Sequence, residues 1–277
     1  MQKYLPTSKR VLQLIQESDK TNAKLKQLTR RRKQLIKEKV AIMHRFNADL
    51  QSCAPDLKLI TSSVDNLWFL RFFTLKKDIR ELARVHTNTI LKIKHLGVKK
   101  LSLIKAWQKE ARFNSDLDLI APMLYEDAIR ILELKTKIKE LEKHIAKLIP
   151  SSHIAKTIQT IPGFATITSA ELAGEIGTLE RFESEASLAL YLGMTNLNKD
   201  SGKQKGSKRS ISTNRHAKMA IITATMKHAQ HVKESKLYIE KKRAEGKKYQ
   251  QAIRSLGRHL VRIIWSMIKQ DRAYEIR

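Results

Sequence analysis

The feature that most constrains the fold of this chain is a long helical repeat of apolar residues over positions 122–148. Apolar side chains recur there at alternating intervals of three and four residues, with one gap, as on one side of an α-helix that packs against another. The stripe consists of Leu124, Ile131, Leu134, Ile138, Leu141, Ile145 and Leu148. The pattern predicts one arm of a coiled coil and leaves two partners open, an antiparallel arm of the same chain or another subunit.

A second helical stripe near the N-terminus is a candidate for the other arm. Residues 8–50 contain no Pro or Gly, and apolar side chains recur at Leu25, Leu28, Leu35, Ile42 and Phe46. Between the two stripes, residues 57–118 carry a cluster of aromatics, Trp68, Phe69, Phe72, Phe73 and Trp107, and predict a small inserted helical subdomain. Pro150 interrupts the second stripe, so we expect a coiled-coil and helical dimerisation region over 1–150 and a compact helical domain over 151–277.

The chain is strongly basic, with 55 Lys and Arg against 27 Asp and Glu and a formal net charge of +28. A charge so far from zero favours a polyanionic partner, DNA or RNA. The run Arg30, Arg31, Arg32 and Lys33 places cations along the first predicted helix, and we expect them to contact phosphates. The sequence shows neither a signal-peptide core nor an apolar run long enough to span a bilayer, so we expect a cytoplasmic protein with no membrane partner.

Two motifs in the C-terminal half suggest phosphate contacts. The turn at Ile161-Pro162-Gly163-Phe164 leads into an Ala-rich helix, as in a helix-hairpin-helix, and predicts contacts through Gly163 and Thr166. The second motif is the polar segment 196–214. Its candidate nucleic-acid-binding residues are Lys203, Lys205, Lys208 and Arg209. An ordinary capped turn and a solvated connection are the alternative interpretations of these two motifs.

Three other groups have structural explanations that we prefer. Glu171 and Glu175 lie one helical turn apart and are read as an ordinary helix face rather than metal ligands. His228 and His231 lack a clear third ligand. The aromatics Trp68, Phe69, Phe72 and Phe73 are expected in a core, although they could stack on bases.

The order of motifs in the C-terminal half resembles a known transposase domain. It runs Ile-Pro-Gly-Phe, Ala-Glu-Leu, Arg-Phe, Leu-Ala-Leu-Tyr-Leu-Gly-Met, Ser-Gly, Ile-Ser and Asn-Arg-His. This order is similar to that of the IS-one-ten type of insertion-sequence enzymes, the DEDD transposases that act as bridge-RNA-guided serine recombinases. The resemblance extends to the basic helix at 25–39. It implies a mostly α fold, DNA transposition, DNA and guide RNA as partners, and homo-oligomers formed through the coiled coil.

The resemblance also implies a catalytic residue, Ser201 of the Ser-Gly pair, which would attack a DNA phosphate. The chain departs from the family where Gly193-Met194-Thr195-Asn196 lacks a Pro and where Thr213-Asn214-Arg215 replaces Lys-x-Gly. The acidic RuvC-like domain of the family was not found, so we expect a truncated or split product that is inactive alone. Mg²⁺ is expected only with that domain, and no cofactor in this chain.

Two further interpretations stay open beside the transposase. One is a non-catalytic nucleic-acid-binding module or a decayed transposase remnant, which would share the charge and the hairpin motif without forming a covalent link. The other is a structural RNA-binding protein associated with the ribosome. A strong preference for structured RNA over DNA would indicate the latter.

Overall fold

The computed structural model describes residues 19–94, 96–113, 117–195, 197–198, 207–208 and 213–275. These residues are mostly helical, as the sequence predicted. They belong to two compact units, one formed by the chain up to Arg31 together with Glu142 onward, the other by Arg32–Leu141. The expected domain boundary at residue 150 stays a prediction, and this division adds the start of the N-terminal helix to the C-terminal part. The reason is that the first turns of the N-terminal helix pack on the C-terminal part, where Leu25 is fully buried in the core.

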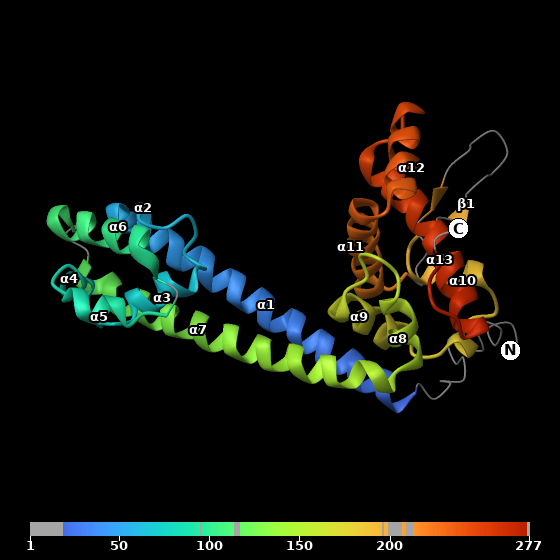
Figure 1. The fold of residues 1–277 in the computed structure, drawn as a ribbon, viewed down its shortest axis with the longest axis horizontal. Coiled ribbons are helices and arrows are strands. Elements are labelled where there is room, and N and C mark those ends of the chain that lie inside the picture. The colour runs from blue at the N-terminus through green and yellow to red at the C-terminus, as the bar shows by residue number, and fades with distance from the viewer. Residues whose placement is uncertain are drawn as a thin grey trace, which may run out of the picture. The chain divides into compact units, whose positions relative to one another are not determined.

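The 32–141 unit is built on two long helices, α1 (Lys20–Cys53) and α7 (Leu117–Leu148), which run side by side there (Figure 1). Arg130 Nη2 donates to Glu38 Oε1 at 2.6 Å, and Arg45 pairs with Asp127 nearer the other end. The two pairs follow opposite directions along the helices, so the arms are antiparallel within one chain. Their apolar stripes share one core cluster, which includes Leu35, Ile42, Phe46, Leu124, Ile131 and Leu134.

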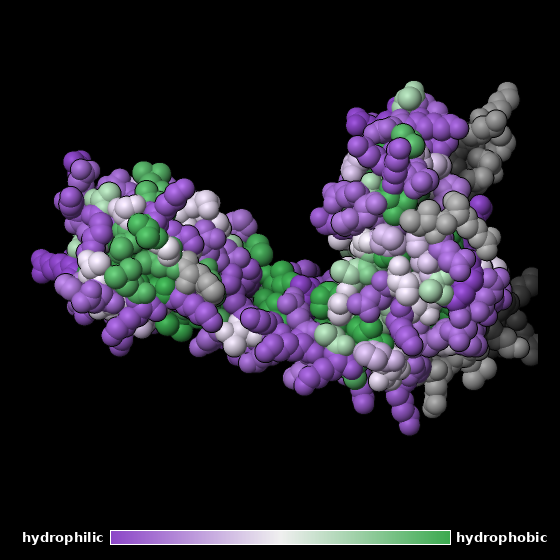
Figure 2. Space-filling view, viewed as in Figure 1, coloured by the Kyte–Doolittle hydropathy of each residue, from purple (hydrophilic) through white to green (hydrophobic). Residues whose placement is uncertain are grey.

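Short helices at the far end of this unit complete its core. They are α2 (Pro55–Leu59), α3 (Leu67–Phe73), α4 (Ile79–Leu82), α5 (Thr87–Leu91) and α6 (Gly97–Glu110). Trp68, Phe69, Phe72 and Phe73 are all buried, and Phe72 meets Trp107 edge to face. Packing therefore accounts for these aromatics. Figure 2 shows apolar side chains on the surface of this unit, where Leu59 and Val98 are exposed.

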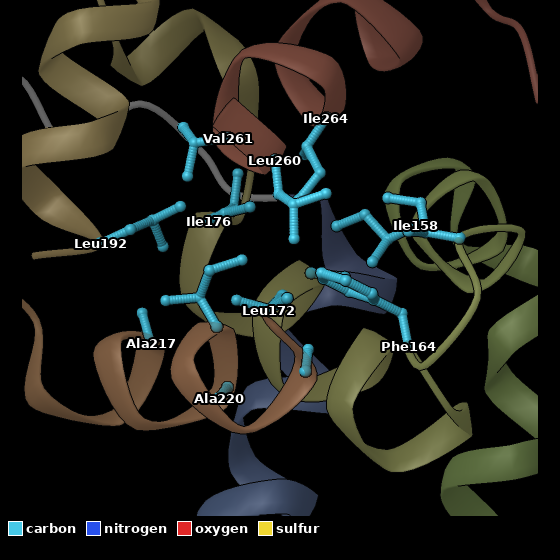
Figure 3. Close-up of a cluster of buried hydrophobic side chains, with 14 of the residues drawn as sticks. Ile158, Phe164, Leu172, Ile176, Leu192, Ala217, Ala220, Leu260, Val261 and Ile264 are labelled. Atoms are coloured by element: carbon cyan, nitrogen blue, oxygen red, sulfur yellow. The ribbon is translucent and has the colours of Figure 1, made fainter. Parts of the chain in front are cut away.

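The other unit is a compact helical bundle with two very short strands. Its elements are η1 (Ile149–Ser151), α8 (His153–Gln159), α9 (Thr166–Ile176), η2 (Leu179–Arg181), α10 (Glu185–Tyr191), β1 (Leu197–Asn198), β2 (Ser207–Lys208), α11 (Arg215–His231), α12 (Lys233–Ala244) and α13 (Tyr249–Gln270). Figure 3 shows the core, in which Leu172 and Ile176 of α9 lie among side chains of α8, α11 and α13. Helix α9 is thus the central element on which the unit is assembled.

Two glycines allow backbones to approach α9 and the turn before it. A Cβ atom on Gly174 would lie 2.6 Å from the backbone nitrogen of Lys26, so α1 crosses α9 directly at this point. Gly163 has a φ of 86°, and a Cβ there would lie 2.3 Å from the backbone nitrogen of His228 in α11. Both positions require glycine because any larger residue would collide with backbone.

The structure differs from the sequence expectation at three elements: α11, α7 and the segment 196–214. The sequence predicts one helix over about 215–234, but α11 ends at His231, because Val232 is extended and precedes a separate helix, α12. Helix α7 begins before the expected Pro122, which lies inside its first two turns. The segment expected to be a plain loop contains the antiparallel pairs Leu197 with Lys208 and Asn198 with Ser207. No helix among the described residues has the length and apolar character to cross a membrane.

Candidate functional site

The predicted nucleophile and most of its cationic neighbours lie outside the described residues. This holds for Ser201, Lys203, Lys205 and Arg209. Lys208 belongs to β2, of which only the backbone is described. The structure does describe both ends of the segment that carries these residues, and the candidate site is built from those ends.

Both ends of the 195–212 segment are fixed to the C-terminal turn of α10. On the entering side, the Met194 N–H donates to the Ala189 carbonyl at 2.9 Å. On the leaving side, the Asn214 N–H donates to the Tyr191 carbonyl at 2.8 Å, and the Thr213 hydroxyl donates to the Leu190 carbonyl at 3.2 Å. The segment with Ser201 therefore starts and finishes at one helix end, which fixes its attachment to the bundle.

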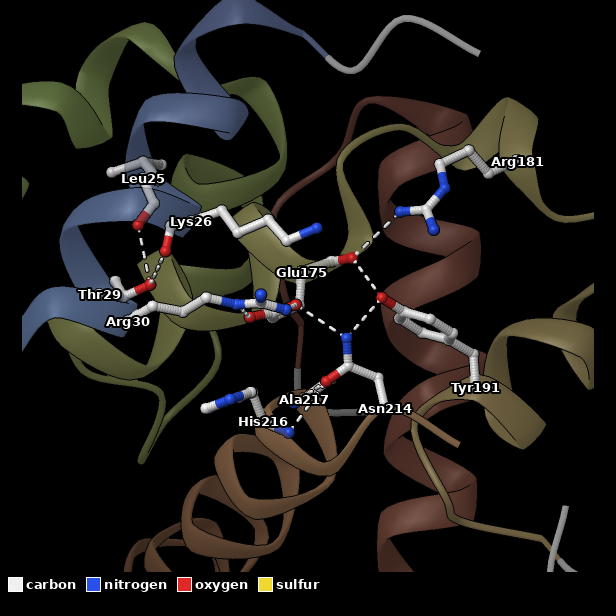
Figure 4. Close-up of polar contacts among 10 residues, drawn as sticks. All are labelled: Leu25, Lys26, Thr29, Arg30, Glu175, Arg181, Tyr191, Asn214, His216 and Ala217. Carbon is white, nitrogen blue, oxygen red and sulfur yellow. Dashed lines mark hydrogen bonds and ion pairs between the residues drawn. The ribbon is translucent and has the colours of Figure 1, made fainter. Parts of the chain in front are cut away.

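Asn214 connects this attachment to a buried carboxylate. Its Oδ1 accepts from the N–H groups of His216 and Ala217, so it is the N-cap of α11. Its Nδ2 donates to Glu175 Oε2 at 2.8 Å and to the Tyr191 hydroxyl at 2.6 Å. Figure 4 shows these bonds converging between α9, α10 and α11. One side chain thus terminates the segment, starts a helix and joins the ionic centre of the bundle.

Glu175 forms this centre with Arg30 of α1. Arg30 donates from Nε and Nη2 to the two carboxylate oxygens at 2.7 and 2.9 Å, a bidentate pair. The Glu175 side chain is only 2% exposed, whereas Arg30 keeps 43%. Burial acts to raise the pKa of Glu175, but the hydrogen bonds from Arg30 and Asn214 outweigh it and hold the pKa below its ordinary value.

The end of α9 is closed by two further donors that the sequence did not single out. Arg181 Nη1 donates to the Ile176 carbonyl at 2.7 Å, and the Tyr191 hydroxyl donates to the Glu175 carbonyl at 2.9 Å. These groups satisfy carbonyls that a helix end leaves without partners. We call Arg30, Glu175, Asn214 and Tyr191 the Glu175 network. Hydrogen bonds between side chains and hydrogen bonds to backbone carbonyls both hold it together.

The basic run on α1 is engaged within the chain. Arg30 is bound to Glu175, and Arg31, Arg32 and Lys33 also have partners inside the protein. Their predicted contact with phosphates stays a prediction. A run of cations in a sequence does not reveal that a carboxylate 145 positions away will meet the first of them.

The Pro-Gly turn packs on α11. Its Gly163 faces the backbone of His228, and the His228 ring nitrogen Nδ1 contacts the Pro162 carbonyl at 2.7 Å. Thr166 is the first residue of α9, and its hydroxyl accepts from Gln159 at 2.9 Å. The binding of phosphate by Gly163 and Thr166 stays a prediction, since the contacts described here are internal.

The other polar groups also have structural contacts. His228 is buried, and its burial lowers its pKa. Glu171 is buried on α9 and has a partner within the chain. Among the residues that the structure describes, no three His, Cys, Asp or Glu side chains come together as metal ligands.

Comparison with known proteins finds similarity in the C-terminal half of the chain. Residues 155–240 match the model of the family described as "Transposase IS116/IS110/IS902 family". The chain is 27% identical over 148 residues to the insertion element IS116 uncharacterized 44.8 kDa protein of Streptomyces clavuligerus, covering 53% of this chain and 37% of that protein. It is 28% identical over 158 residues to the insertion element IS900 uncharacterized 42 kDa protein of Mycobacterium paratuberculosis, covering 56% and 40%.

A third relative matches a similar share of the chain. The chain is 26% identical over 162 residues to the insertion element IS110 uncharacterized 43.6 kDa protein of Streptomyces coelicolor, covering 58% of this chain and 39% of that protein. The chain thus matches less than half of the length of each of these relatives. The matched family region, 155–240, contains the segment with Ser201, the cap Asn214 and the carboxylate of Glu175.

Proposed function

We propose that this chain, whose residues 155–240 match the model of the IS116/IS110/IS902 transposase family, binds DNA and takes part in transposition with Ser201 as nucleophile. The observation that carries the proposal is the attachment of the Ser201 segment at both ends to the last turn of α10. A nucleophile needs a fixed position relative to the bound strand, since catalysis depends on orientation. The Glu175 network, which holds Asn214, supports that position.

The proposed step is a transesterification at a DNA phosphate. The Ser201 oxygen forms a bond to phosphorus while the bond from phosphorus to the leaving sugar oxygen breaks, and the serine proton ends on that oxygen. The product is a phosphoserine link to one strand and a free hydroxyl on the other fragment. Lys203, Lys205, Lys208 and Arg209 would stabilise the charge on the phosphate.

Binding is tested with the whole chain and a fluorescent duplex DNA, by anisotropy at several salt concentrations. If about six phosphates are neutralised, affinity should fall roughly a thousandfold between about 50 and 200 mM salt. A chain that ignores DNA at low ionic strength, or whose affinity does not depend on salt, contradicts the proposal.

The covalent step is tested with labelled DNA, guide RNA and Mg²⁺, with the RuvC-like acidic domain implied by the resemblance supplied in trans. We expect a labelled protein–DNA adduct that survives denaturation in the wild type and disappears in Ser201→Ala. Ser210→Ala is the matched control, because it removes a hydroxyl from the same segment and should retain the adduct. Binding without an adduct in any of the proteins would instead support the non-catalytic module.

Two partners also belong to the proposal. Guide RNA should compete with duplex DNA or assemble with it, which native gel mobility of the chain with each nucleic acid would show. Homo-oligomers through the helical arms predict a mass above that of one 32.0 kDa chain in light scattering. In the structure the apolar stripes of α1 and α7 face each other within one chain, so an oligomer would use other surfaces of the arms.

A further inference from the structure

The polar side of α13 carries arginines at a regular spacing. Arg254, Arg258 and Arg262 follow one another at intervals of four residues, so they lie on one side of the helix about 6 Å apart along its axis. The opposite side of α13 is buried in the core through residues that include Ile253, Leu260, Val261 and Ile264. The three arginines therefore lie along the side of α13 away from this core, with Arg254 and Arg258 half-buried and Arg262 exposed.

Helices α10 and α12 border this strip (Figure 1) and supply few negative charges to it. Glu185 of α10 forms an ion pair with Arg258, and its Oε2 lies 3.9 Å from Arg262 Nε. One carboxylate therefore compensates the charge of two guanidinium groups. Among the described residues Arg254 has no ion-pair partner, and the Arg262 side chain is 60% exposed. The strip has an excess of positive charge within the described part of the chain.

Hydrogen-bonding groups stand beside these cations. The Tyr238 hydroxyl of α12 lies 2.8 Å from Ser255 Oγ and 3.0 Å from His259 Nε2, both on α13. Burial lowers the pKa of His259, and the cations Arg262, Arg258 and Lys242 lower it further. The lowered pKa therefore indicates a positive electrostatic potential at the imidazole, and a bound anion would reduce this potential.

We propose that this surface, the α13 arginine face (Arg254, Arg258 and Arg262 with Tyr238, Ser255 and His259), binds the phosphodiester backbone of duplex DNA. Guanidinium groups match phosphate oxygens bidentately, and hydroxyl groups of Ser and Tyr are ordinary phosphate donors. Such contacts position a duplex without reading its sequence. The inference rests on the proposed function for its choice of DNA, because it adds a backbone contact to the same reaction.

The helix that carries the α13 arginine face also packs on Met194 at the start of the Ser201 segment. Gly257 lies one helical turn from both Arg254 and Val261, and a Cβ on Gly257 would lie 2.6 Å from the Met194 sulfur. Met194 is the residue that attaches the segment to α10. Helix α13 therefore carries the arginines on its outer side and contacts the base of the Ser201 segment with its buried side.

The test compares the double variant Arg254→Ala/Arg262→Ala with the wild type, using anisotropy of duplex DNA over a salt series. Arg258 is retained because its pair with Glu185 joins α13 to α10. Losing two phosphate contacts lowers the slope of log affinity against log salt by about 1.8. For a wild type with about six contacts, the fall between about 50 and 200 mM salt then becomes about 150-fold, which is roughly twelvefold smaller than the fall of the wild type.

Two control variants separate this effect from a change of fold or of total charge. Arg84→Ala/Arg112→Ala removes the same charge from exposed arginines of the 32–141 unit and should retain the wild-type slope. Arg254→Lys/Arg262→Lys keeps the charge and should also retain most of the slope, at lower affinity. Far-UV circular dichroism checks that each variant has the wild-type helix content.

The outcomes distinguish this inference from the proposed function. An unchanged slope in Arg254→Ala/Arg262→Ala, with steep binding by the wild type, overturns the α13 arginine face and leaves DNA binding intact. A wild type that does not bind DNA overturns both. If the variant loses affinity only for a structured RNA of equal length, the assignment to DNA is wrong. In NMR titrations, DNA should raise the pKa of His259, and no change of that pKa would argue against contact here.

Discussion

The pair between Arg30 and Glu175 gives a sharp prediction about stability. Replacing Arg30 with Ala leaves a carboxylate that is 2% exposed without its bidentate partner. Removing one member of a fully buried pair costs about 3–5 kcal/mol. Since Arg30 itself keeps 43% of its side chain exposed, solvent screening lowers the loss. We expect Arg30→Ala to reduce the free energy of unfolding by about 2 kcal/mol near pH 7.

A matched control isolates the burial of the carboxylate. Arg130 forms a similar hydrogen-bonded pair with Glu38, and its own exposure of 41% is almost that of Arg30, but Glu38 is 40% exposed. Arg130→Ala should therefore change stability much less, because water replaces the lost partner. Urea unfolding followed by circular dichroism measures both variants. A loss in Arg30→Ala no larger than that in Arg130→Ala would refute the reasoning.

The same pair predicts a pH dependence with a definite sign. The pKa of Glu175 is below its ordinary value in the folded protein, so its charged form stabilises the fold. This contribution is present above the unfolded-state pKa, about 4.3, and is lost as pH falls through the lower folded-state pKa. The difference between wild type and Arg30→Ala should therefore shrink as the solution is acidified below about pH 4. A difference that grows there would mean that Glu175 is not the responsible group.

Two other substitutions test the packing around this site. Gly163→Ala should lower the free energy of unfolding by more than about 2 kcal/mol, because it adds backbone strain and places a Cβ 2.3 Å from the backbone nitrogen of His228. Gly246 is the control, because its φ is 83° but a Cβ there would meet open space, so Gly246→Ala should show the strain alone. Equal losses of stability in thermal unfolding would contradict the close approach at Gly163. Asn214→Ala should cost about 1–2 kcal/mol as a lost N-cap. Asn214→Asp keeps the cap but sets a second carboxylate against Glu175, so it should be no more stable than Asn214→Ala; a wild-type melting temperature in Asn214→Asp would count against the Glu175 network.

The sequence predicted those elements whose signals are local. Caps, small residues and apolar spacing predict helices over about 168–176, 184–192 and 249–269, and the structure has them at Thr166–Ile176, Glu185–Tyr191 and Tyr249–Gln270. The end of α11 at His231 was missed, since Val232 ends it without a Gly or Pro. Nothing in a local window shows that tertiary packing makes this residue extended.

The site was less predictable for a related reason. Glu175 fits an ordinary helix face, and nothing in the sequence around it indicates its partner Arg30 on a distant helix. Asn214 was noted only as a departure from the family pattern, although an Asn directly before a predicted helix is a good N-cap signal. The spacing of Arg254, Arg258 and Arg262 is visible in the sequence, but only the structure shows which helices border them.

The bundle is assembled from two stretches of chain separated by more than a hundred residues, which has a consequence for its synthesis. Leu25 and Asn22 are made early, yet the core around Leu25 and the Gly177 carbonyl that accepts from Asn22 are made only after the 32–141 unit is complete. During translation the first turns of α1 are therefore synthesised before the part of the bundle on which they pack. For the same reason, a fragment that contains only residues 151–277 would bury the Glu175 carboxylate without its partner Arg30.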